Sequence, residues 1–374
     1  MAEVLNLAAK YSKKVDERFT QESQAMMALN SDYDFDGVRT VNIYSIPTSP
    51  MHDYNRSGSN RYGEPEELGR NIQTESVTQD RSFSFTIDKG NKKQSQMVMD
   101  AGKALGRQIK EVWVPEFDAY VFRKLAAAAK ANGNYSDTEL TKSTAYAAIL
   151  TAMEYMGDVG AAENLVCFCS WNFYNLILQD PNFVKTADSS QEMLKKGVVG
   201  TVDGLKLVKV PSARLPYGTN FLIVNKKSAC GVRQLQEYRT HTDPPGISGW
   251  LVEGRVIHDC FVLDEKVDGI YWQGGQKKVL RRLKVTVSDL ADGDGNVKIL
   301  VNPGVPETGN KFMYKLGAAP EVVTNTTNVT SWTPLTASGL QVAAASNKFV
   351  TVVECPAAGT TCQGVGSAKI KRNI

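Results

Sequence analysis

A chain of 374 residues is long enough for two or three domains, at about 100–200 residues per domain. Its hydrophobic content of 42% and charged content of 22% are ordinary for a globular protein and exclude disorder throughout. The net charge of +3, from 43 basic and 40 acidic residues, excludes the large basic excess of a dedicated duplex-DNA binder. No apolar run approaches the ~20 residues of a membrane span, so we expect no membrane-spanning segment.

The first predicted element is a helix over residues 4–29. Apolar residues at helical spacing form one stripe, namely Val4, Ala8, Tyr11, Val15 and Phe19. Charged residues of both signs lie between them in the sequence. The polar residues 30–34 then interrupt this pattern.

Residues 39–90 predict a long two-stranded excursion with a polar tip. A β-rich stretch over 41–46 leads into a polar, glycine-bearing stretch that could not fill a core. The returning strand alternates polar residues with apolar ones, which are Val77, Phe83, Phe85 and Ile87. Because a two-stranded ribbon is marginally stable alone, we expect it to lie against something else, such as another copy of the protein.

Three helices are expected next. Residues 94–113 carry apolar side chains four apart, and Pro115 starts or kinks a second helix that Gly133 ends. Ser136 is followed three residues later by Glu139, which is the spacing of a capping box for a third helix.

Beyond this point the pattern alternates strand and helix. Leu165–Cys169 predicts a short buried strand, and Ser170 is placed to cap the helix that follows. A hairpin is expected over 198–210, with further strands at 221–224 and within 250–272.

Residues 285–374 are rich in Val, Thr, Asn and Gly and have no helical period. They predict a small all-β region, sandwich- or immunoglobulin-like in pattern, with strands at 284–287, 296–301, 311–316 and 349–354. Cys355 and Cys362 flank a short loop in this region. A disulfide between them is one hypothesis, and two free thiols are the alternative.

The sequence shows no assembled catalytic, cofactor-binding or metal site. Its three histidines are far apart in the sequence: His52 lies in the polar tip, His241 in a proline-bearing loop and His258 in a predicted strand. Cys167 and Cys169 alternate on one strand and do not form the paired Cys-x-x-Cys spacing of a zinc site. Because no phosphate-binding glycine loop is present either, we expect no cofactor and no enzymatic activity.

Residues 78–126 are specific enough to suggest a family. The segments TQDRSFSFTIDKGN, GKALGRQIKEV and VPEFDAYVFRKLA resemble the major capsid proteins of tailed bacteriophages, in which a long hairpin (the E-loop) runs into the spine helix of the P-domain. The preceding block VNIYSIPTSPMHDYNRSGSNRYGEPEELG is similar to the outgoing E-loop strand and tip. The later blocks GLKLVKVPSARLPYGTNFLIVNKKSA and GWLVEGRVIHDCFVLDEKVDGIY resemble the A-domain core and the strands that close the fold. The resemblance covers roughly residues 1–275.

This resemblance implies an α+β fold of the Hong Kong 97 type with an added C-terminal all-β, immunoglobulin-like domain. It divides the chain into an N-terminal arm (1–38), the E-loop hairpin (39–90), a P-domain with the spine helix (91–160), an A-domain (161–247), closing strands of the capsid core (248–281) and the C-terminal β-domain (282–374). The E-loop residues that we expect to contact a neighbouring subunit are Phe83, Phe85, Ile87, Arg81 and Asp88.

The implied function is structural: a major capsid subunit self-assembles as hexamers and pentamers into the icosahedral head of a tailed phage and encloses its double-stranded DNA by non-specific contact. Further implied partners are a scaffolding protein, a portal and a decoration protein. Assembly is expected in the host bacterial cytoplasm, and the final location is the virion capsid. The alternatives are an encapsulin-type nanocompartment shell and, in a different class, a surface adhesin carried by the C-terminal β-domain.

Overall fold

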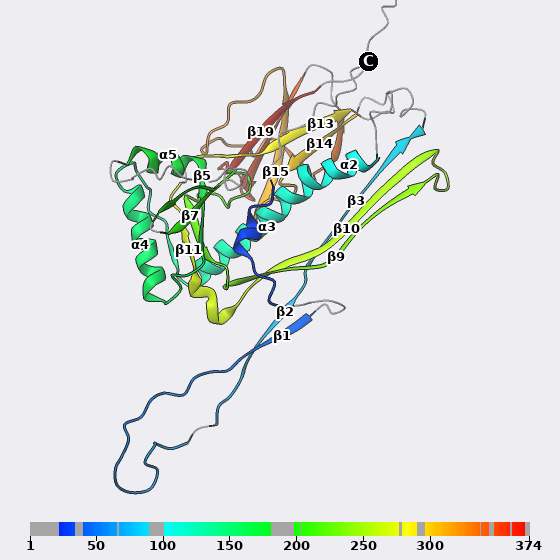
Figure 1. Ribbon diagram of the computed structural model, residues 1–374. Coiled ribbons are helices and arrows are strands. Elements are labelled where there is room, and N and C mark those ends of the chain that lie inside the picture. The colour runs from blue at the N-terminus through cyan, green and yellow to red at the C-terminus, as the bar shows by residue number, and fades with distance from the viewer. Residues whose placement is uncertain are drawn as a thin grey trace, which may run out of the picture.

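The computed structural model describes residues 22–33, 40–65, 67–89, 101–180, 198–202, 204–276, 279–289, 296–336, 338–343, 348–359 and 361–370. Figure 1 shows a mixed α+β body from which one long loop projects. Most of the helix expected over 4–29, and the start of the one expected over 94–113, lie outside the described residues. Within 22–29 the structure has only one 3-10 turn, η1 (Ala25–Ala28), so the helix prediction is wrong there.

A six-stranded sheet forms the centre of the body, in the order β4-β11-β8-β5-β7-β6. Its strands are β4 (Tyr135–Ser136), β5 (Leu165–Ser170), β6 (Val198–Val202), β7 (Leu205–Val210), β8 (Phe221–Asn225) and β11 (Ile270–Gln273). The predicted strands at 165–169 and 221–224 and the hairpin over 198–210 are therefore confirmed.

Helices cover both faces of this sheet. The side chains of β5 are buried along its whole length and alternate between two cores. Phe168 packs in one core with α3 (Val114–Ala131), where its ring centroid lies 4.9 Å from that of Phe122. Leu165, Cys167 and Cys169 pack in the other core with α4 (Ala145–Asp158) and α5 (Trp171–Gln179). Burial on both sides explains why the strand is a continuous apolar run.

The start of α5 was predicted correctly, whereas the start of α4 was not. The Ser170 hydroxyl accepts a hydrogen bond from the backbone N–H of Phe173 at 3.2 Å, as expected of a helix cap. The capping-box spacing at Ser136 does not start a helix, because Ser136 lies on β4 and pairs with β11. Helix α4 instead begins after Thr144. Pairing with a strand more than 130 residues away overrides the local signal.

One long helical run crosses the molecule (Figure 1) and consists of α2 (Ala101–Gln108), the π-helical turn η2 (Ile109–Trp113) and α3. Pro115 lies in the first turn of α3, where its missing N–H interrupts the helical hydrogen bonds. The predicted second helix therefore exists, but it continues directly from the π turn. A π-helical turn of this kind lets the helix continue past the irregularity at Pro115.

The returning strand of the expected hairpin divides in two. Its first part, β2 (Asn71–Ser76), pairs with β1 (Thr40–Ser45). Its second part, β3 (Gln79–Asp88), joins β10 (Gly249–Val262) and β9 (Ala229–Thr242) in a three-stranded sheet of order β3-β10-β9. Phe83 lies opposite Gly254, and a Cβ at position 254 would approach the Phe83 ring to 2.4 Å. Glycine therefore makes room for the aromatic ring.

The C-terminal region contains two packed sheets. One has the order β12-β19-β18-β15-β16, and the other has the order β13-β14-β17. The strands are β12 (Arg281–Arg282), β13 (Lys284–Asp289), β14 (Asn296–Asn302), β15 (Asn310–Gly317), β16 (Thr333–Leu335), β17 (Leu340–Ala343), β18 (Phe349–Pro356) and β19 (Gly364–Lys369). Inward-facing residues of both sheets share one hydrophobic core. All four strands predicted for this region are present.

Candidate functional site

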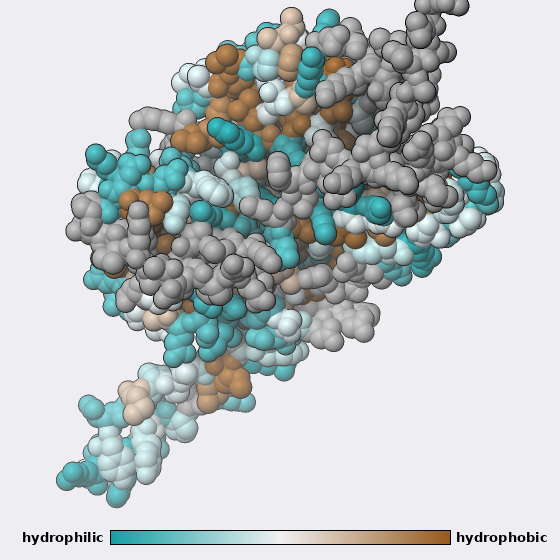
Figure 2. Space-filling view, turned by 45° about the horizontal axis from the view of Figure 1, so that its top comes forward, coloured by the Kyte–Doolittle hydropathy of each residue, from teal (hydrophilic) through white to brown (hydrophobic). Residues whose placement is uncertain are grey.

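The excursion formed by β1, β2 and the residues between them exposes apolar side chains. Exposure reaches 97% for Met51, 85% for Tyr62 and 78% for Ile46. Figure 2 shows the excursion standing clear of the body, with a mainly hydrophilic surface and a hydrophobic patch near its base. These exposed apolar groups make the excursion a candidate interaction surface.

The tip of the excursion has a defined local structure. The N–H of Asn55 donates to the Arg61 carbonyl at 2.9 Å, and the N–H of Gly63 donates to the Asn60 carbonyl at 3.0 Å. The Tyr54 and Tyr62 rings meet edge to face with centroids 5.0 Å apart. The tip therefore has a defined conformation within the single chain, and a preorganised element loses less entropy when it binds.

Side-chain hydrogen bonds attach the base of the excursion to the body. The Gln73 amide donates to the Val262 carbonyl at 2.8 Å and accepts from the N–H of Asp264 at 3.1 Å. The Ser45 hydroxyl donates to Glu265 Oε1 at 3.1 Å. These bonds hold the excursion against η3 (Asp264–Gly269), so the direction in which it leaves the body is set within one chain.

The residues that we expected to contact a neighbour do not form one exposed surface. Ile87 is only 7% exposed, whereas Phe83 and Phe85 are half-buried and stack on each other with centroids 6.2 Å apart. Arg81 Nε forms an ion pair with Glu116 Oε1 of α3 at 2.6 Å. Asp88 lies on the opposite face of β3 from Ile87. Contact of this strand with a neighbouring copy stays a prediction.

A buried carboxylate fixes the junction between β2 and β3 onto the long helix. Asp259 on β10 accepts hydrogen bonds from the Thr78 N–H and hydroxyl, both at 2.8 Å, and from Tyr120 at 2.6 Å. Lys124 Nζ lies 2.9 Å from the same carboxylate. Burial raises the pKa of Asp259, but the hydrogen bonds from Tyr120 and Lys124 outweigh burial and hold it below its usual value. The sequence analysis did not find this role of Asp259, because its partners Thr78, Tyr120 and Lys124 lie far from it in the sequence.

A second buried carboxylate, Asp118 of α3, holds the N-terminal segment. It accepts hydrogen bonds from the Ser23 hydroxyl at 2.6 Å and the Gln24 N–H at 3.0 Å, and it pairs with Arg214 at 2.7 Å. Burial raises the pKa of Asp118, and the Arg214 charge opposes that effect. These bonds satisfy the backbone where a helix was predicted, so residues 22–25 follow the surface of α3 instead.

A third buried cluster joins the C-terminal sheets to the rest of the chain. Arg281 is 3% exposed, pairs with Glu307 at 2.8 Å and also contacts Glu354. Burial raises the pKa of Glu354, but the Arg281 charge together with hydrogen bonds from the Glu307 N–H and the Asn310 side chain lowers it by more, so it lies below its ordinary value. From α3, Arg123 donates to the Val305 carbonyl at 2.9 Å. The cluster fixes the C-terminal sheets on the long helix.

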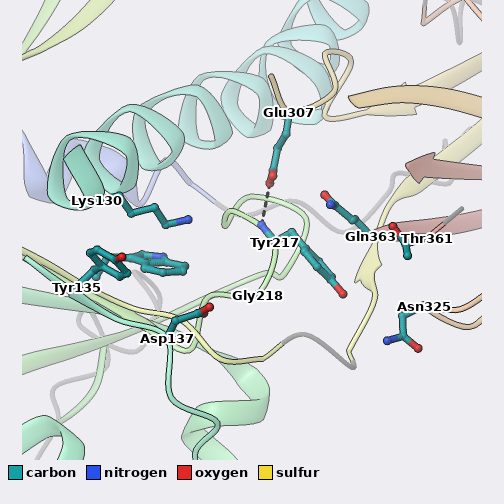
Figure 3. Close-up of a pocket in the computed structure, with 10 residues that line it drawn as sticks. Lys130, Tyr135, Asp137, Tyr217, Gly218, Glu307, Asn325, Thr361 and Gln363 are labelled. Carbon is teal, nitrogen blue, oxygen red and sulfur yellow. Dashed lines mark hydrogen bonds between the residues drawn. The ribbon is translucent and has the colours of Figure 1, made fainter. Parts of the chain in front are cut away.

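Beside this cluster lies a cleft of ≈ 680 Å³ between the central sheet and the C-terminal sheets (Figure 3). The N–H of Tyr217 crosses its edge to donate to Glu307 Oε1 at 2.8 Å. On the opposite wall, Lys130 Nζ lies 3.6 Å from the centroid of the Trp272 ring. The hydrogen bond between Tyr217 and Glu307 joins the loop before β8 to the C-terminal region across the edge of this cleft.

His258 and His241 lie in different surroundings. His258 is buried among the rings of Trp113, Phe117 and Tyr120, whereas His241 Nε2 is 3.4 Å from Glu253 at the surface. Within the described ranges, no three His, Cys, Asp or Glu side chains gather as a metal site would require. No described helix is both long enough and apolar enough to span a membrane.

Cys355 and Cys362 are buried thiols in one hydrophobic cluster. The Cys362 thiol donates to the Thr327 carbonyl at 3.4 Å, and burial with the nearby Cys355 raises its pKa to about 11. A disulfide between the two stays a prediction, which thiol titration of the denatured protein would test.

A sheet covered on both faces, a long helix and a projecting arm with exposed apolar groups are features that suit a subunit of a larger assembly. The chain belongs to the phage capsid protein family, whose match spans residues 74–277, more than half of the sequence.

Solved structures share this fold. A structure from Mycobacterium phage Che8 is 15% identical, with a TM-score of 0.58 over 73% of this chain and 98% of that chain. The capsid structure of cyanophage P-SCSP1u is 13% identical, with a TM-score of 0.57 over 72% and 93% of the two chains. The asymmetric unit of the bacteriophage PhiM1 mature capsid is 14% identical, with a TM-score of 0.54 over 72% and 91%. No curated protein matches the chain.

The function is therefore structural. The chain is a phage major capsid subunit that self-assembles into the capsid lattice of the virion. The alternatives considered from the sequence, a nanocompartment shell and an adhesin, are not favoured by these matches.

Proposed function

We propose that the chain has the Hong Kong 97-type arrangement and assembles as hexamers and pentamers into the closed icosahedral head of a tailed phage. In this proposal the segment before residue 39 is the N-terminal arm, the β1–β2 excursion is the tip-bearing part of the E-loop, and α2–α3 is the spine helix. Strands β5, β6, β7 and β8 of the six-stranded sheet belong to the A-domain, β4 to the P-domain and β11 to the closing strands. The two C-terminal sheets are an added immunoglobulin-like domain.

The observation that carries this proposal is the excursion itself. It projects from the body, exposes Ile46, Met51 and Tyr62, and has a tip with internal hydrogen bonds. An isolated two-stranded ribbon gains little stability from its own contacts. A neighbouring copy that covers the excursion would bury those apolar groups and join the two subunits.

Sedimentation and negative-stain microscopy of the purified full-length chain test the proposal. Closed shells, or rings of five or six copies, are expected. The proposed partners are packaged double-stranded DNA, a scaffolding protein, a portal and a decoration protein, and assembly takes place in the host cytoplasm. A chain that stays monomeric alone should therefore form shells when it is co-expressed with its scaffold. A monomer under both conditions would contradict the proposal.

A further inference from the structure

The cleft of ≈ 680 Å³ beside the Arg281 cluster has the size of a small-molecule site. Ligand pockets commonly occupy about 300–1,000 Å³. One wall of the cleft comes from the end of α3, from β4 and β11 and from the loop before β8, and the other wall comes from the C-terminal region (Figure 3). The cleft therefore exists only where these two parts of the chain meet, and neither part forms it alone.

Aromatic rings make up much of the first wall. Tyr135 on β4 is the register partner of Trp272 on β11, and their ring centroids are 6.3 Å apart. Lys130 lies over the Trp272 ring, which is only 3% exposed, whereas Tyr135 is 48% exposed. A further ring, that of Tyr217, lies between the two walls in Figure 3. Tyrosine rings offer a flat apolar surface with a polar group at one edge, and Tyr135 is the more open of these two strand-borne rings.

The backbone and side chains of this wall are fixed by the fold. The N–H of Trp272 donates to the Asn134 carbonyl at 3.0 Å, which holds β4 and therefore Tyr135 against β11. The indole N–H of Trp272 donates to the Thr219 hydroxyl at 2.9 Å. A wall that is already ordered loses little entropy when a ligand binds to it.

The charged groups around the cleft cancel one another. Lys130 and Asp137 lie on the same wall and carry opposite charges (Figure 3). On the other wall, Glu307 pairs with Arg281 at 2.8 Å. The remaining residues of the described lining are uncharged. The cleft therefore has no excess charge with which to hold a phosphate group or a free cation, and its chemistry favours a neutral polar ligand.

Neutral groups that donate and accept hydrogen bonds line the second wall. They are the side chains of Asn325, Thr361 and Gln363 (Figure 3). An amide carries a donor and an acceptor side by side, and a hydroxyl can act as either. The Gln363 amide is held in place, because its Oε1 accepts from Asn310 Nδ2 at 2.8 Å. Such a set matches a ligand edge that is rich in hydroxyl groups, each of which also donates and accepts.

We propose that this cleft binds a neutral saccharide of a few sugar units. The C–H groups on one face of a sugar ring are apolar and pack on the open ring of Tyr135, while the hydroxyl groups bond to Asn325, Thr361 and Gln363. This binding is additional to the role of the chain as a capsid subunit and does not depend on how the subunits are arranged. It requires both walls, so the C-terminal region alone does not carry it.

Saturation-transfer NMR titrations of the purified full-length chain test the class of ligand. The probes are maltotriose, cellotriose and triacetylchitotriose, and ATP and spermidine are the charged comparisons. At least one of the trisaccharides should bind saturably with a Kd of about 1 mM or tighter, and neither charged compound should compete with it. Failure of every trisaccharide to bind, or competition by ATP or spermidine, overturns the proposal.

Substitutions on the two walls test the location. Tyr135→Ala should weaken trisaccharide binding about tenfold, whereas Tyr135→Phe keeps the ring and should bind like the wild type. Thr361→Trp places a large side chain at an exposed position of the opposite wall and should abolish binding by filling the cleft. The matched control is Trp171→Ala on α5, which removes a ring that is also 48% exposed and should leave the affinity unchanged.

Circular dichroism and sedimentation check that each variant folds and assembles like the wild type. Weaker binding in Tyr135→Ala and Thr361→Trp, with wild-type affinity in Tyr135→Phe and Trp171→Ala, supports the site. Binding that survives both cleft substitutions, or that falls equally in Trp171→Ala, overturns it. If Tyr135→Ala fails to fold, Thr361→Trp decides between these outcomes.

Discussion

The side-chain amide of Asn302 donates a hydrogen bond to the backbone carbonyl of Glu111. In a regular α-helix the N–H of residue 115 would donate to this carbonyl, but Pro115 has no N–H. A side chain from β14 thus replaces a backbone hydrogen bond that is missing at the π-helical turn η2 of the long helix. The relationship links the stability of the helix to the attachment of the C-terminal region. Asn302 also lines a groove of ≈ 290 Å³ together with Pro115 and Pro303.

Removing that amide should weaken the fold. Asn302→Ala leaves the Glu111 carbonyl without this donor, and we expect a loss of about 1–3 kcal/mol in the free energy of unfolding. Denaturant unfolding of the unassembled chain measures it. Asn172→Ala, at an exposed position of α5, is the matched control and should change stability by less than about 0.5 kcal/mol. Equal stability of the two variants would show that the contact contributes nothing.

The Asp118 cluster should control the N-terminal segment. Asp118→Asn removes the charge that Ser23, Gln24 and Arg214 share, and hydrogen bonds to charged groups contribute about 1.5–3 kcal/mol. We expect faster proteolytic cleavage within residues 22–30, measured by limited digestion and mass spectrometry. Asp158→Asn, at the exposed end of α4, should leave the cleavage rate unchanged. An unchanged rate in Asp118→Asn would rule out the attachment.

The Asp259 cluster gives a pH dependence with a definite sign. The pKa of Asp259 is lower in the folded chain than the ~3.9 of an unfolded chain. Its ionised form therefore stabilises the fold above about pH 4, and this contribution is lost as the pH falls through the folded-state pKa. Asp259→Asn should be less stable than the wild type at pH 7, and the difference should shrink below pH 4. Denaturant unfolding across that range measures it, and a constant difference would contradict the assignment.

Substitutions at two positions of β3 should have different effects, one on folding and the other on assembly. Ile87→Asp places a charge at a buried position and should destabilise the subunit by about 2–5 kcal/mol. Phe85→Asp, at a half-buried position, should leave the monomer folded and soluble but block assembly. Circular dichroism and sedimentation distinguish the two defects. Ser84→Asp on the polar face is the control, and normal particles from Phe85→Asp would refute contact of this face with a neighbour.

Local sequence determined the elements whose signals lie within a few residues. The alternation in β14, the continuous apolar run of β5 and the Ser170 cap all predict structures that form, because periodicity and capping depend on neighbours along the chain. The segments resembling phage capsid proteins likewise predicted the family that the comparison later showed.

Tertiary structure decided the features that depend on distant partners. Ser136 has a helix-start spacing but joins the sheet edge, and residues 22–25 fold against Asp118 and not as a helix. Thr78 and Asp259 are 181 residues apart in sequence and 2.8 Å apart in the fold. No local pattern encodes such pairs. Burial makes each of these polar groups costly unless a partner satisfies it, and only the folded chain determines which partner lies within reach.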